Sequence, residues 1–310
     1  MSQDAAPRPT LWAVVGATGT GKSALSLAIA ERLADQGRPA EIVNADAMQF
    51  YRGMDIGTAK LSVAQRRSIP HHLFDALDPT AEATVAWYQP QARSVIEQIH
   101  ARGADAILVG GSGLYVSSAV YDFQFPPRDE KIRAELEAEA EENGTAGLLA
   151  RLAALSPETA AAVDARNPRR VVRALEVALL GADPRVTLPT EPALWLPGTR
   201  LISVECERAT LVERLDERVV QMWADGLIDE VRGLIAQGIE RGVTASRAIG
   251  YAQALGQIRG RLTQAEAIAK TQALTRRYAR RQVAWFKRYP GIEHVNGPDI
   301  DAVLGEPPAD

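Results

Sequence analysis

A glycine-rich segment, GATGTGKS at residues 16–23, constrains the fold of this chain more than any other feature. It matches the pattern G-x-x-x-x-G-K-[ST] and lies between an apolar run at 11–16 and a helical pattern at 22–37. In such a segment the glycines let backbone N–H groups turn towards phosphate oxygens, and the helix start adds its positive dipole end. The segment therefore predicts a loop that binds a di- or triphosphate within an α/β fold.

The rest of the chain continues the α/β pattern and then interrupts it. Apolar runs at 40–46 and 104–111 predict further strands separated by helices, which indicates a parallel sheet with right-handed crossovers. Residues 128–183 carry only helical patterns, and strand signals return at 200–206 and, for a short strand, at 292–296. We predict a P-loop NTPase-like parallel sheet flanked by helices, with an all-helical insertion domain and a helical C-terminal part.

Proline-rich segments mark the expected domain boundaries in this chain of 310 residues. We place the first part of the P-loop core at 10–121, the helical insertion at 122–198 and the continuation of the core at 199–298. The terminal segments, 1–9 and 299–310, are expected to be flexible.

Several classes of protein are excluded by what the chain lacks. A single cysteine, Cys206, excludes an internal disulfide and a cysteine-cluster zinc site. The N-terminus has no apolar segment typical of a secretory signal, and no apolar run approaches the ~18 residues of a membrane span. We therefore expect a cytoplasmic protein without membrane contacts.

Basic residues gather in two acid-free clusters, although the formal net charge is −4. Such clusters in an acidic protein favour a polyanionic partner. The first cluster consists of Arg166, Arg169, Arg170 and Arg173. The second cluster consists of Lys270, Arg276, Arg277, Arg280, Arg281, Lys287 and Arg288.

Asp46 is the acidic residue that ends a predicted strand. ATPases and GTPases hold their metal with an Asp at the end of an apolar strand, but the run at 104–111 ends in glycines. We expect the strand of Asp46 to lie beside the phosphate-binding loop. From the residues alone, Asp46 either holds a metal, acts on an acceptor substrate, or only caps a helix.

Eight segments together resemble the bacterial tRNA dimethylallyltransferases, also called tRNA isopentenyltransferases. In the family's order they are GATGTGKS, NADAMQFYRGMDIGTAK, PHHLFD, LVGGSGLY, NPRRVVRALEV, RLDERVVQM, SRAIGYAQ and TRRYARRQVAWFKR. The chain departs from many relatives at Ser23 and Ser112, where they have threonine, and both changes keep the hydroxyl group. The eukaryotic relatives' C-terminal zinc finger has no counterpart here.

The resemblance implies a transfer reaction. The dimethylallyl group of dimethylallyl diphosphate would pass to N6 of the adenine just 3′ of the anticodon in tRNA, and diphosphate would be released. The phosphate-binding loop would then hold a diphosphate leaving group, with Mg²⁺ on Ser23 and with the backbone amides of residues 18–23. The implied donor-binding residues are Gly16, Ala17, Thr18, Gly19, Thr20, Gly21, Lys22 and Ser23. We expect a monomer.

The resemblance also implies roles for three side chains near the reacting atoms. Asp46 would be the general base that orients the adenine amino group and takes its proton. Arg218 would bind the same diphosphate as Lys22. Ser112, at the tip of a neighbouring strand, would help to place the adenine or the donor.

A base stacked in an anticodon loop must be flipped out before it can react. The resemblance implies that residues from five parts of the chain contact the tRNA, with the arginines mainly holding phosphates. They are Asp46, Ala47, Met48, Gln49 and Ser112; Arg133, Arg169, Arg170 and Arg173; and Arg247, Ala248, Ile249, Gly250, Tyr251 and Ala252.

Three other functions remain open. An adenylate isopentenyltransferase, which modifies free AMP, ADP or ATP, would share the phosphate-binding loop and Asp46. A nucleotide kinase is a second alternative, although the chain lacks an arginine-rich lid, and a regulatory nucleotide-binding module is a third. The helical insertion and the basic clusters favour tRNA, because a free nucleotide needs neither.

Overall fold

The computed structural model describes residues 8–122, 125–184 and 192–306. The chain forms two compact units. The core unit runs up to Tyr121 and resumes at Leu194, and the helical unit covers Asp122–Ala193. The predicted end of the insertion at 198 is therefore wrong by five residues. Leu194 pairs with Tyr121, and the amide of Trp195 donates to the carbonyl of Val120, 2.8 Å away.

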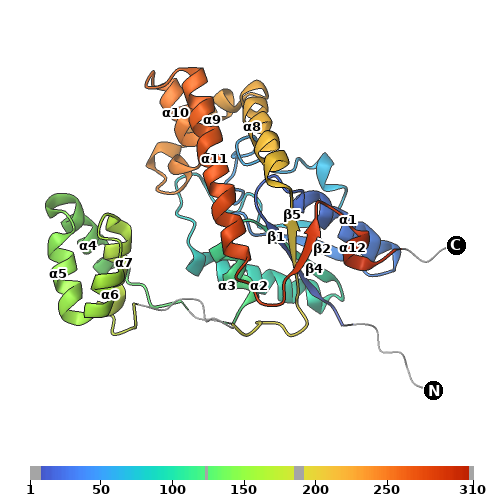
Figure 1. Cartoon of the computed structure of the whole chain (residues 1–310), viewed down its shortest axis with the longest axis horizontal. Coiled ribbons are helices and arrows are strands. Elements are labelled where there is room, and N and C mark those ends of the chain that lie inside the picture. The colour runs from blue at the N-terminus through green and yellow to red at the C-terminus, as the bar shows by residue number, and fades with distance from the viewer. Residues whose placement is uncertain (1–7, 123–124, 185–191, 307–310) are drawn as a thin grey trace. The chain divides into compact units, whose positions relative to one another are not determined.

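A six-stranded parallel sheet organises the core unit (Figure 1). In spatial order its strands are β3 (His71–His72), β2 (Ala40–Asn44), β4 (Asp105–Gly110), β1 (Leu11–Gly16), β5 (Arg200–Glu205) and β6 (Glu293–Asn296). β1 is buried at every position, which explains its continuous apolar sequence. The predicted strands are confirmed, and β3 was missed because two histidines carry no strand pattern.

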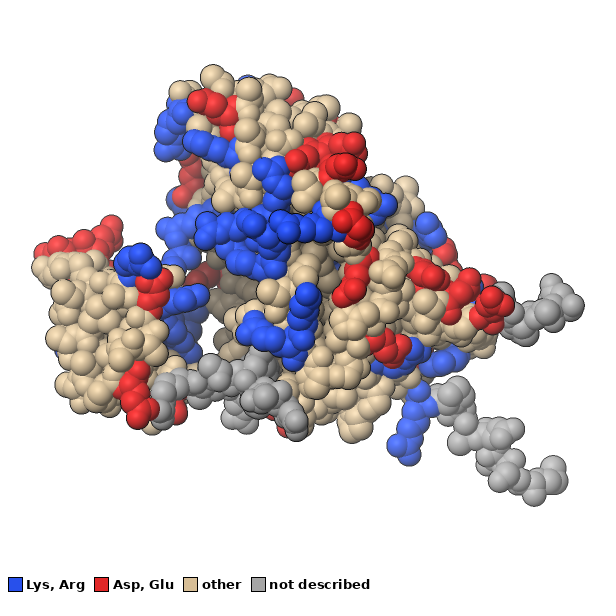
Figure 2. Space-filling model, viewed as in Figure 1, with Lys and Arg blue, Asp and Glu red and all other residues tan. Residues whose placement is uncertain are grey.

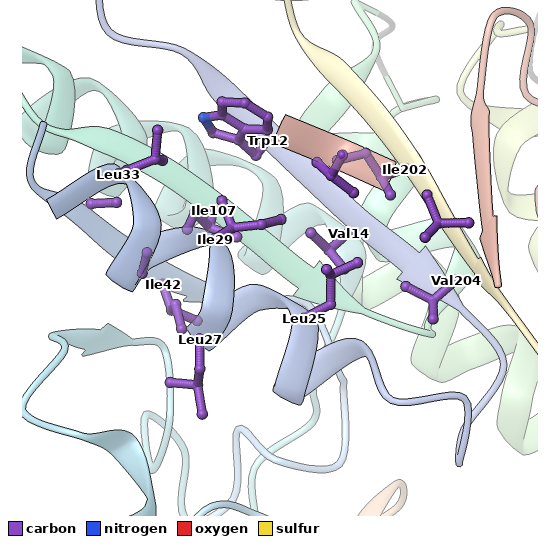
Figure 3. Close-up of a cluster of buried hydrophobic side chains, with 14 residues drawn as sticks. Trp12, Val14, Leu25, Leu27, Ile29, Leu33, Ile42, Ile107, Ile202 and Val204 are labelled. Atoms are coloured by element: carbon purple, nitrogen blue, oxygen red, sulfur yellow. The ribbon is translucent and has the colours of Figure 1, made fainter. Parts of the chain in front are cut away.

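Helices cover both faces of the sheet. Side chains alternate along β1, and both Val14 on one face and Val15 on the other are fully buried. Trp12 and Val14 pack with Leu25 and Ile29 of α1 (Lys22–Asp35), as Figure 3 shows. The core unit also contains α2 (Val85–Ala101), α3 (Gly113–Val120) and a 3₁₀ turn at Ala64–Arg66.

The sequence predicted that residues 299–310 are flexible. This prediction is wrong for part of the segment. Residues 301–304 form α12 (Asp301–Leu304), and Val303 is buried in the same cluster as α1. Asp301 pairs with Arg32 of α1 at 2.9 Å. Residues 1–7 and 307–310, for which the same expectation was made, lie outside the described residues.

The C-terminal part of the core unit is helical, as predicted. Figure 1 shows these helices grouped at one end of the unit. They are α8 (Arg208–Ala224), α9 (Leu227–Ala236), α10 (Tyr251–Ile258) and the long α11 (Gln264–Phe286), with 3₁₀ turns at Ile239–Arg241 and Ala245–Arg247. α11 is joined to α8 by an ion pair between Arg276 and Asp216 at 2.5 Å. None of the helices in the described ranges has the length and apolar character needed to cross a membrane.

The helical unit has an apolar core of its own, in which Leu136, Leu148, Leu152, Val171 and Leu175 are almost fully buried. Its helices are α4 (Glu130–Asn143), α5 (Ala146–Leu155), α6 (Pro157–Ala162) and α7 (Pro168–Leu179). The prediction of helices alone in this region is confirmed for the residues that the structure describes.

Candidate active site

The phosphate-binding loop adopts a backbone that glycine alone accommodates easily. Gly16 has φ 140°, and a Cβ atom there would lie 2.5 Å from the carbonyl oxygen of Val204. Gly21 precedes α1 in the left-handed conformation, with φ 101°. In the described structure no side chain caps the start of α1, so its first N–H groups are available to an anion.

Two cationic side chains face the loop. The cavity here has a volume of about 310 Å³, and its lining includes Thr18, Lys22, Asp46 and Arg218. Lys22 Nζ donates to the carbonyl of Ala17 at 2.7 Å, and Arg218 Nη2 donates to Thr18 Oγ1 at 2.5 Å. Burial lowers the pKa of Lys22 to about 8, although Asp46 acts in the opposite direction. The predicted placement of Arg218 beside the donor-binding loop agrees with this geometry.

Asp46 lies across the same cavity. Its Oδ1 accepts from the Met48 amide at 3.0 Å, and within the described residues its Oδ2 accepts no hydrogen bond. Burial raises the pKa of Asp46, while the Met48 amide, Lys22 and Arg218 partly offset that rise. The backbone of Asp46 is held by Asn44, whose Oδ1 accepts from the Asp46 amide at 2.9 Å. A carboxylate oxygen is therefore available close to two cations.

Asp46 lies beside the phosphate-binding loop, as expected, although its strand β2 is not the neighbour of β1 in the sheet. β4 lies between β2 and β1. Asp46 reaches the cavity because β4 ends in glycine: a Cβ at Gly110 would lie 2.4 Å from the backbone carbonyl group of Ala45. The chain after β2 can therefore cross the end of β4. Gly110, which lies at the strand end where ATPases and GTPases have a metal-binding Asp, leaves room for this crossing.

Ser112 supports the segment that carries Asp46. Its hydroxyl accepts from the amide of Ala47 at 3.2 Å and lies 3.5 Å from the hydroxyl of Tyr278 on α11. The prediction that Ser112 and Asp46 share one edge of the sheet is confirmed. Direct contact of Ser112 with adenine or donor stays a prediction.

The loop after Asp46 is held partly by residues that lie far along the chain. Gln49 lines the cavity and donates to the carbonyl of Thr58 at 3.0 Å. The Glu230 carboxylate of α9 accepts from the amides of Asp55 and Ile56 at 3.1 and 2.7 Å. Tyr251 donates to Glu230 at 2.5 Å. These contacts hold the loop at residues 55–58 against the C-terminal helices.

Burial corrects the tRNA prediction for part of the segment 247–252. Tyr251 is fully buried and Ala248 is 6% exposed, so neither side chain offers surface to RNA. Gly250 is buried too, whereas Arg247 is exposed and Ile249 and Ala252 are half-buried. The ring of Tyr251 instead packs against Gly57, where a Cβ atom would lie 2.4 Å from it.

Two of the arginines assigned to tRNA phosphates are committed within the helical unit. The fully buried Glu176 accepts from Arg133 at 2.7 Å and from Arg173 at 2.9 Å. Burial alone would raise the pKa of Glu176, but these hydrogen bonds lower it overall. Arg173 also donates to the carbonyls of Pro126 and Pro127. Arg133 and Arg173 therefore stabilise the unit, which does not support their assignment to phosphates.

Other basic residues are exposed. Arg169 and Arg170 begin α7, and neither forms an ion pair among the described residues. Figure 2 shows Lys and Arg side chains gathered over the region of α11. On this helix Arg277 and Arg280 are exposed, whereas Arg276 is paired with Asp216. The two basic clusters thus combine free and structural arginines.

The donor-binding cavity has oxygen atoms that could hold a divalent cation. Mg²⁺ in phosphate sites typically takes one or two protein oxygens and completes its shell with phosphate oxygens and water. Ser23 and Asp46 both line the cavity and offer such oxygens. Among the described residues no group of three or more His, Cys, Asp or Glu side chains is placed to hold a metal by itself.

The comparison with known families decides the relationship of this chain. Residues 49–289 match the family model described as IPP transferase. The chain belongs to the IPP transferase family.

Relatives and solved structures of this family cover almost the whole chain. The tRNA dimethylallyltransferase of Clavibacter sepedonicus is 57% identical over 93% of both chains, and that of Thermobifida fusca is 50% identical over 94% of this chain and 92% of its own. The crystal structure of the tRNA isopentenylpyrophosphate transferase of Bacillus halodurans has a TM-score of 0.66. It is 37% identical and covers 93% of this chain and 89% of its own. The family resemblance and the predicted fold class are confirmed.

Three residues that the sequence did not assign hold the loops around the cavity, namely Glu230, Tyr278 and Gln282. Gln282 was visible as a polar residue within TRRYARRQVAWFKR, between the buried Ala279 and Phe286. A buried polar side chain on a helix requires partners, but the sequence does not identify them.

Proposed function

We propose that this protein transfers the dimethylallyl group of dimethylallyl diphosphate to N6 of the adenine just 3′ of the anticodon in tRNA. One observation carries the proposal: a half-buried carboxylate, Asp46, shares a cavity with a phosphate-binding loop and two cations, Lys22 and Arg218. The names of the relatives support the same reaction. The tRNA substrate in the names of these relatives also favours a cytoplasmic location.

The donor half of the reaction needs stabilisation of a leaving group. Cleavage of the C–O bond leaves negative charge on the diphosphate, and preorganised donors stabilise that charge as it develops. Lys22, Arg218 and the N–H groups at the start of α1 would bind the diphosphate oxygens. Mg²⁺ held by Ser23 would add further neutralisation of charge. The amide of Thr18 donates to Gln282 at 2.9 Å. It is therefore not free to bind diphosphate, which corrects its predicted role in the phosphate-binding loop.

The acceptor half of the reaction needs removal of a proton. The adenine amino nitrogen forms a bond to C1 of the dimethylallyl group as the C1–O bond breaks, and it must then lose one proton. Asp46 Oδ2 would take this proton, because Oδ1 is already held by Met48. The raised pKa makes Asp46 a stronger base than an exposed aspartate.

The adenine must leave the anticodon stack to reach Asp46. Exposed arginines support RNA as the acceptor, since Arg169, Arg170, Arg277 and Arg280 can bind phosphates. A free nucleotide would need none of them. Whether the protein is a monomer stays a prediction.

The direct test combines the pure protein and radiolabelled dimethylallyl diphosphate with an unmodified anticodon stem-loop RNA. We expect label in the RNA without ATP. A stem-loop with purine, which lacks the amino group, at the target position is the matched control and should remain unlabelled. Equal labelling of free AMP would favour the adenylate isopentenyltransferase, and phosphoryl transfer from ATP would favour a kinase. Either result would overturn the proposed function.

A further inference from the structure

A buried glutamine connects two loops that border the cavity. Gln282 lies on α11 and is 4% exposed. Its Oε1 accepts from the amide of Thr18 at 2.9 Å, and its Nε2 donates to the carbonyl of Gly111 at 2.8 Å. The phosphate-binding loop and the loop between β4 and α3 are therefore joined by a single side chain.

The loop between β4 and α3 is shaped to receive this side chain. A Cβ at Gly111 would lie 2.2 Å from Gln282 Nε2, so only glycine leaves room for the amide. One turn along α11, the ring of Trp285 lies 2.4 Å from where a Cβ of Gly113 would be. One turn in the other direction, the hydroxyl of Tyr278 lies 3.5 Å from that of Ser112. The loop thus fits against α11 over three successive residues, 111–113.

The two loops that Gln282 joins belong to different halves of the reaction. Thr18 accepts from Arg218 through its side chain, so the donor side is fixed through Thr18. Ser112 accepts from the amide of Ala47, next to Asp46, so the acceptor side is fixed through the β4–α3 loop. A displacement of ~1 Å between reacting groups can reduce a rate about 100-fold.

We propose that Gln282 is a positioning residue that aligns the diphosphate-binding loop with the segment carrying Asp46. The proposal rests on the proposed function, because it assigns these loops to donor and acceptor. Gln282 does not contact the reacting atoms. Its effect is on the geometry of the two loops and therefore on the transfer step rather than on binding of either substrate.

The first test uses Gln282→Met, which keeps the length of the side chain and removes both hydrogen bonds. At saturating substrates we expect the single-turnover transfer rate to fall about 10- to 100-fold. The affinities for inorganic diphosphate and for the stem-loop RNA should stay within about threefold of the parent. Gln272→Met is the matched control, because Gln272 is on the same helix but donates to the backbone of Asp216 on α8.

A merely structural role predicts a different result. Gln282→Met would then lower the melting temperature, but the transfer rate measured well below that temperature would equal that of the parent. This outcome overturns the proposal. A parent protein that transfers no label to RNA overturns the proposed function and this proposal with it, so the two failures are distinguishable.

A second variant covers the case in which Gln282→Met does not fold. Gly111→Ala leaves α11 unchanged but pushes its new methyl group against the end of the Gln282 side chain. We expect a similar loss of transfer rate and unchanged affinity for diphosphate. A Gly111→Ala protein that transfers as fast as the parent would overturn the proposal. If both single variants fold, their effects should not add in the double variant, because both remove the same link. Strictly additive losses would contradict it.

Discussion

The phosphate-binding loop and the loop that carries Asp46 line one cavity but are stabilised in different ways. The phosphate-binding loop is held mainly by its own residues: the hydroxyl of Thr20 and the ammonium of Lys22 both donate to the carbonyl of Ala17. The loop of Asp46 depends on residues far along the chain, including Ser112 and Glu230. The difference teaches that the phosphate-binding loop has local contacts of its own, to which folding adds Arg218 and Gln282, whereas the loop of Asp46 is held mainly by contacts that exist only in the folded core unit.

The largest expected effect comes from removing the carboxylate of Asp46, at the centre of the acceptor side. Asp46→Asn keeps the shape of the side chain and an oxygen for the Met48 amide, but it removes the base. We expect kcat to fall by about 10²- to 10⁴-fold, with both substrates still bound. Single-turnover transfer with labelled donor measures the loss, and the affinity for diphosphate serves as control. A variant within threefold of the parent would exclude Asp46 as the base.

The next effect concerns the donor side. Lys22→Ala should lower kcat/KM for the donor by about 100-fold, because a cation beside the leaving group is lost. RNA affinity should be unchanged, because the Lys22 ammonium donates within the phosphate-binding loop and is not assigned to RNA. Binding assays with diphosphate and with stem-loop RNA separate the two. Loss of RNA affinity of similar size would mean that the two sides are not independent.

Lys22 should also make donor binding depend on pH. Because its pKa is lowered to about 8, the free protein carries a cation there below pH 8 and a neutral amine above it. Diphosphate favours the cation, so donor affinity should fall about tenfold per pH unit above pH 8. Lys22→Arg stays charged and is the control. If both proteins gave the same pH profile, the dependence would belong to the diphosphate and not to Lys22.

A smaller effect tests the remote anchor of the acceptor loop. In Glu230→Gln one acceptor oxygen is replaced by an NH₂ group that faces the amides of residues 55–57. We expect a loss of ~1–3 kcal/mol in stability and about a tenfold decrease in kcat/KM. Thermal melting and steady-state kinetics measure them. Glu240→Gln breaks an exposed pair with Arg259 and is the control, with an expected loss of stability smaller than that of Glu230→Gln. Equal behaviour of the two variants would remove Glu230 from the acceptor site.

The smallest expected effect on turnover comes from changing exposed arginines. It distinguishes arginines that can bind RNA phosphates from arginines that are paired within the protein. Changing Arg169 and Arg170 together to alanine should weaken RNA binding and reduce the log–log salt slope by about 1.4 to 1.8. Donor affinity should not change. Arg133→Ala should instead destabilise the helical unit by ~1–3 kcal/mol, because Glu176 loses a partner in a buried site. An unchanged salt slope in the double variant would show that Arg169 and Arg170 do not bind phosphates.

Much of the fold and the donor site could be predicted from the sequence alone. Continuous apolar runs specified the central strands, helical periodicity specified the helical unit, and GATGTGKS specified the phosphate-binding loop. These features depend on neighbours a few residues apart, so their pattern is visible in the chain itself. The family resemblance added Asp46 and Arg218, and both line the cavity with Lys22.

The tertiary structure alone decided the remaining features. The order of the strands placed β4 between Asp46 and the phosphate-binding loop, and Gly110 let the chain cross it. The burial of Glu176 decided that Arg133 and Arg173 pair within the protein while Arg169 stays exposed. The physical reason is the same in each case. Hydrogen bonds, ion pairs and close packing depend on distances between residues far apart in sequence, and only folding brings those residues together.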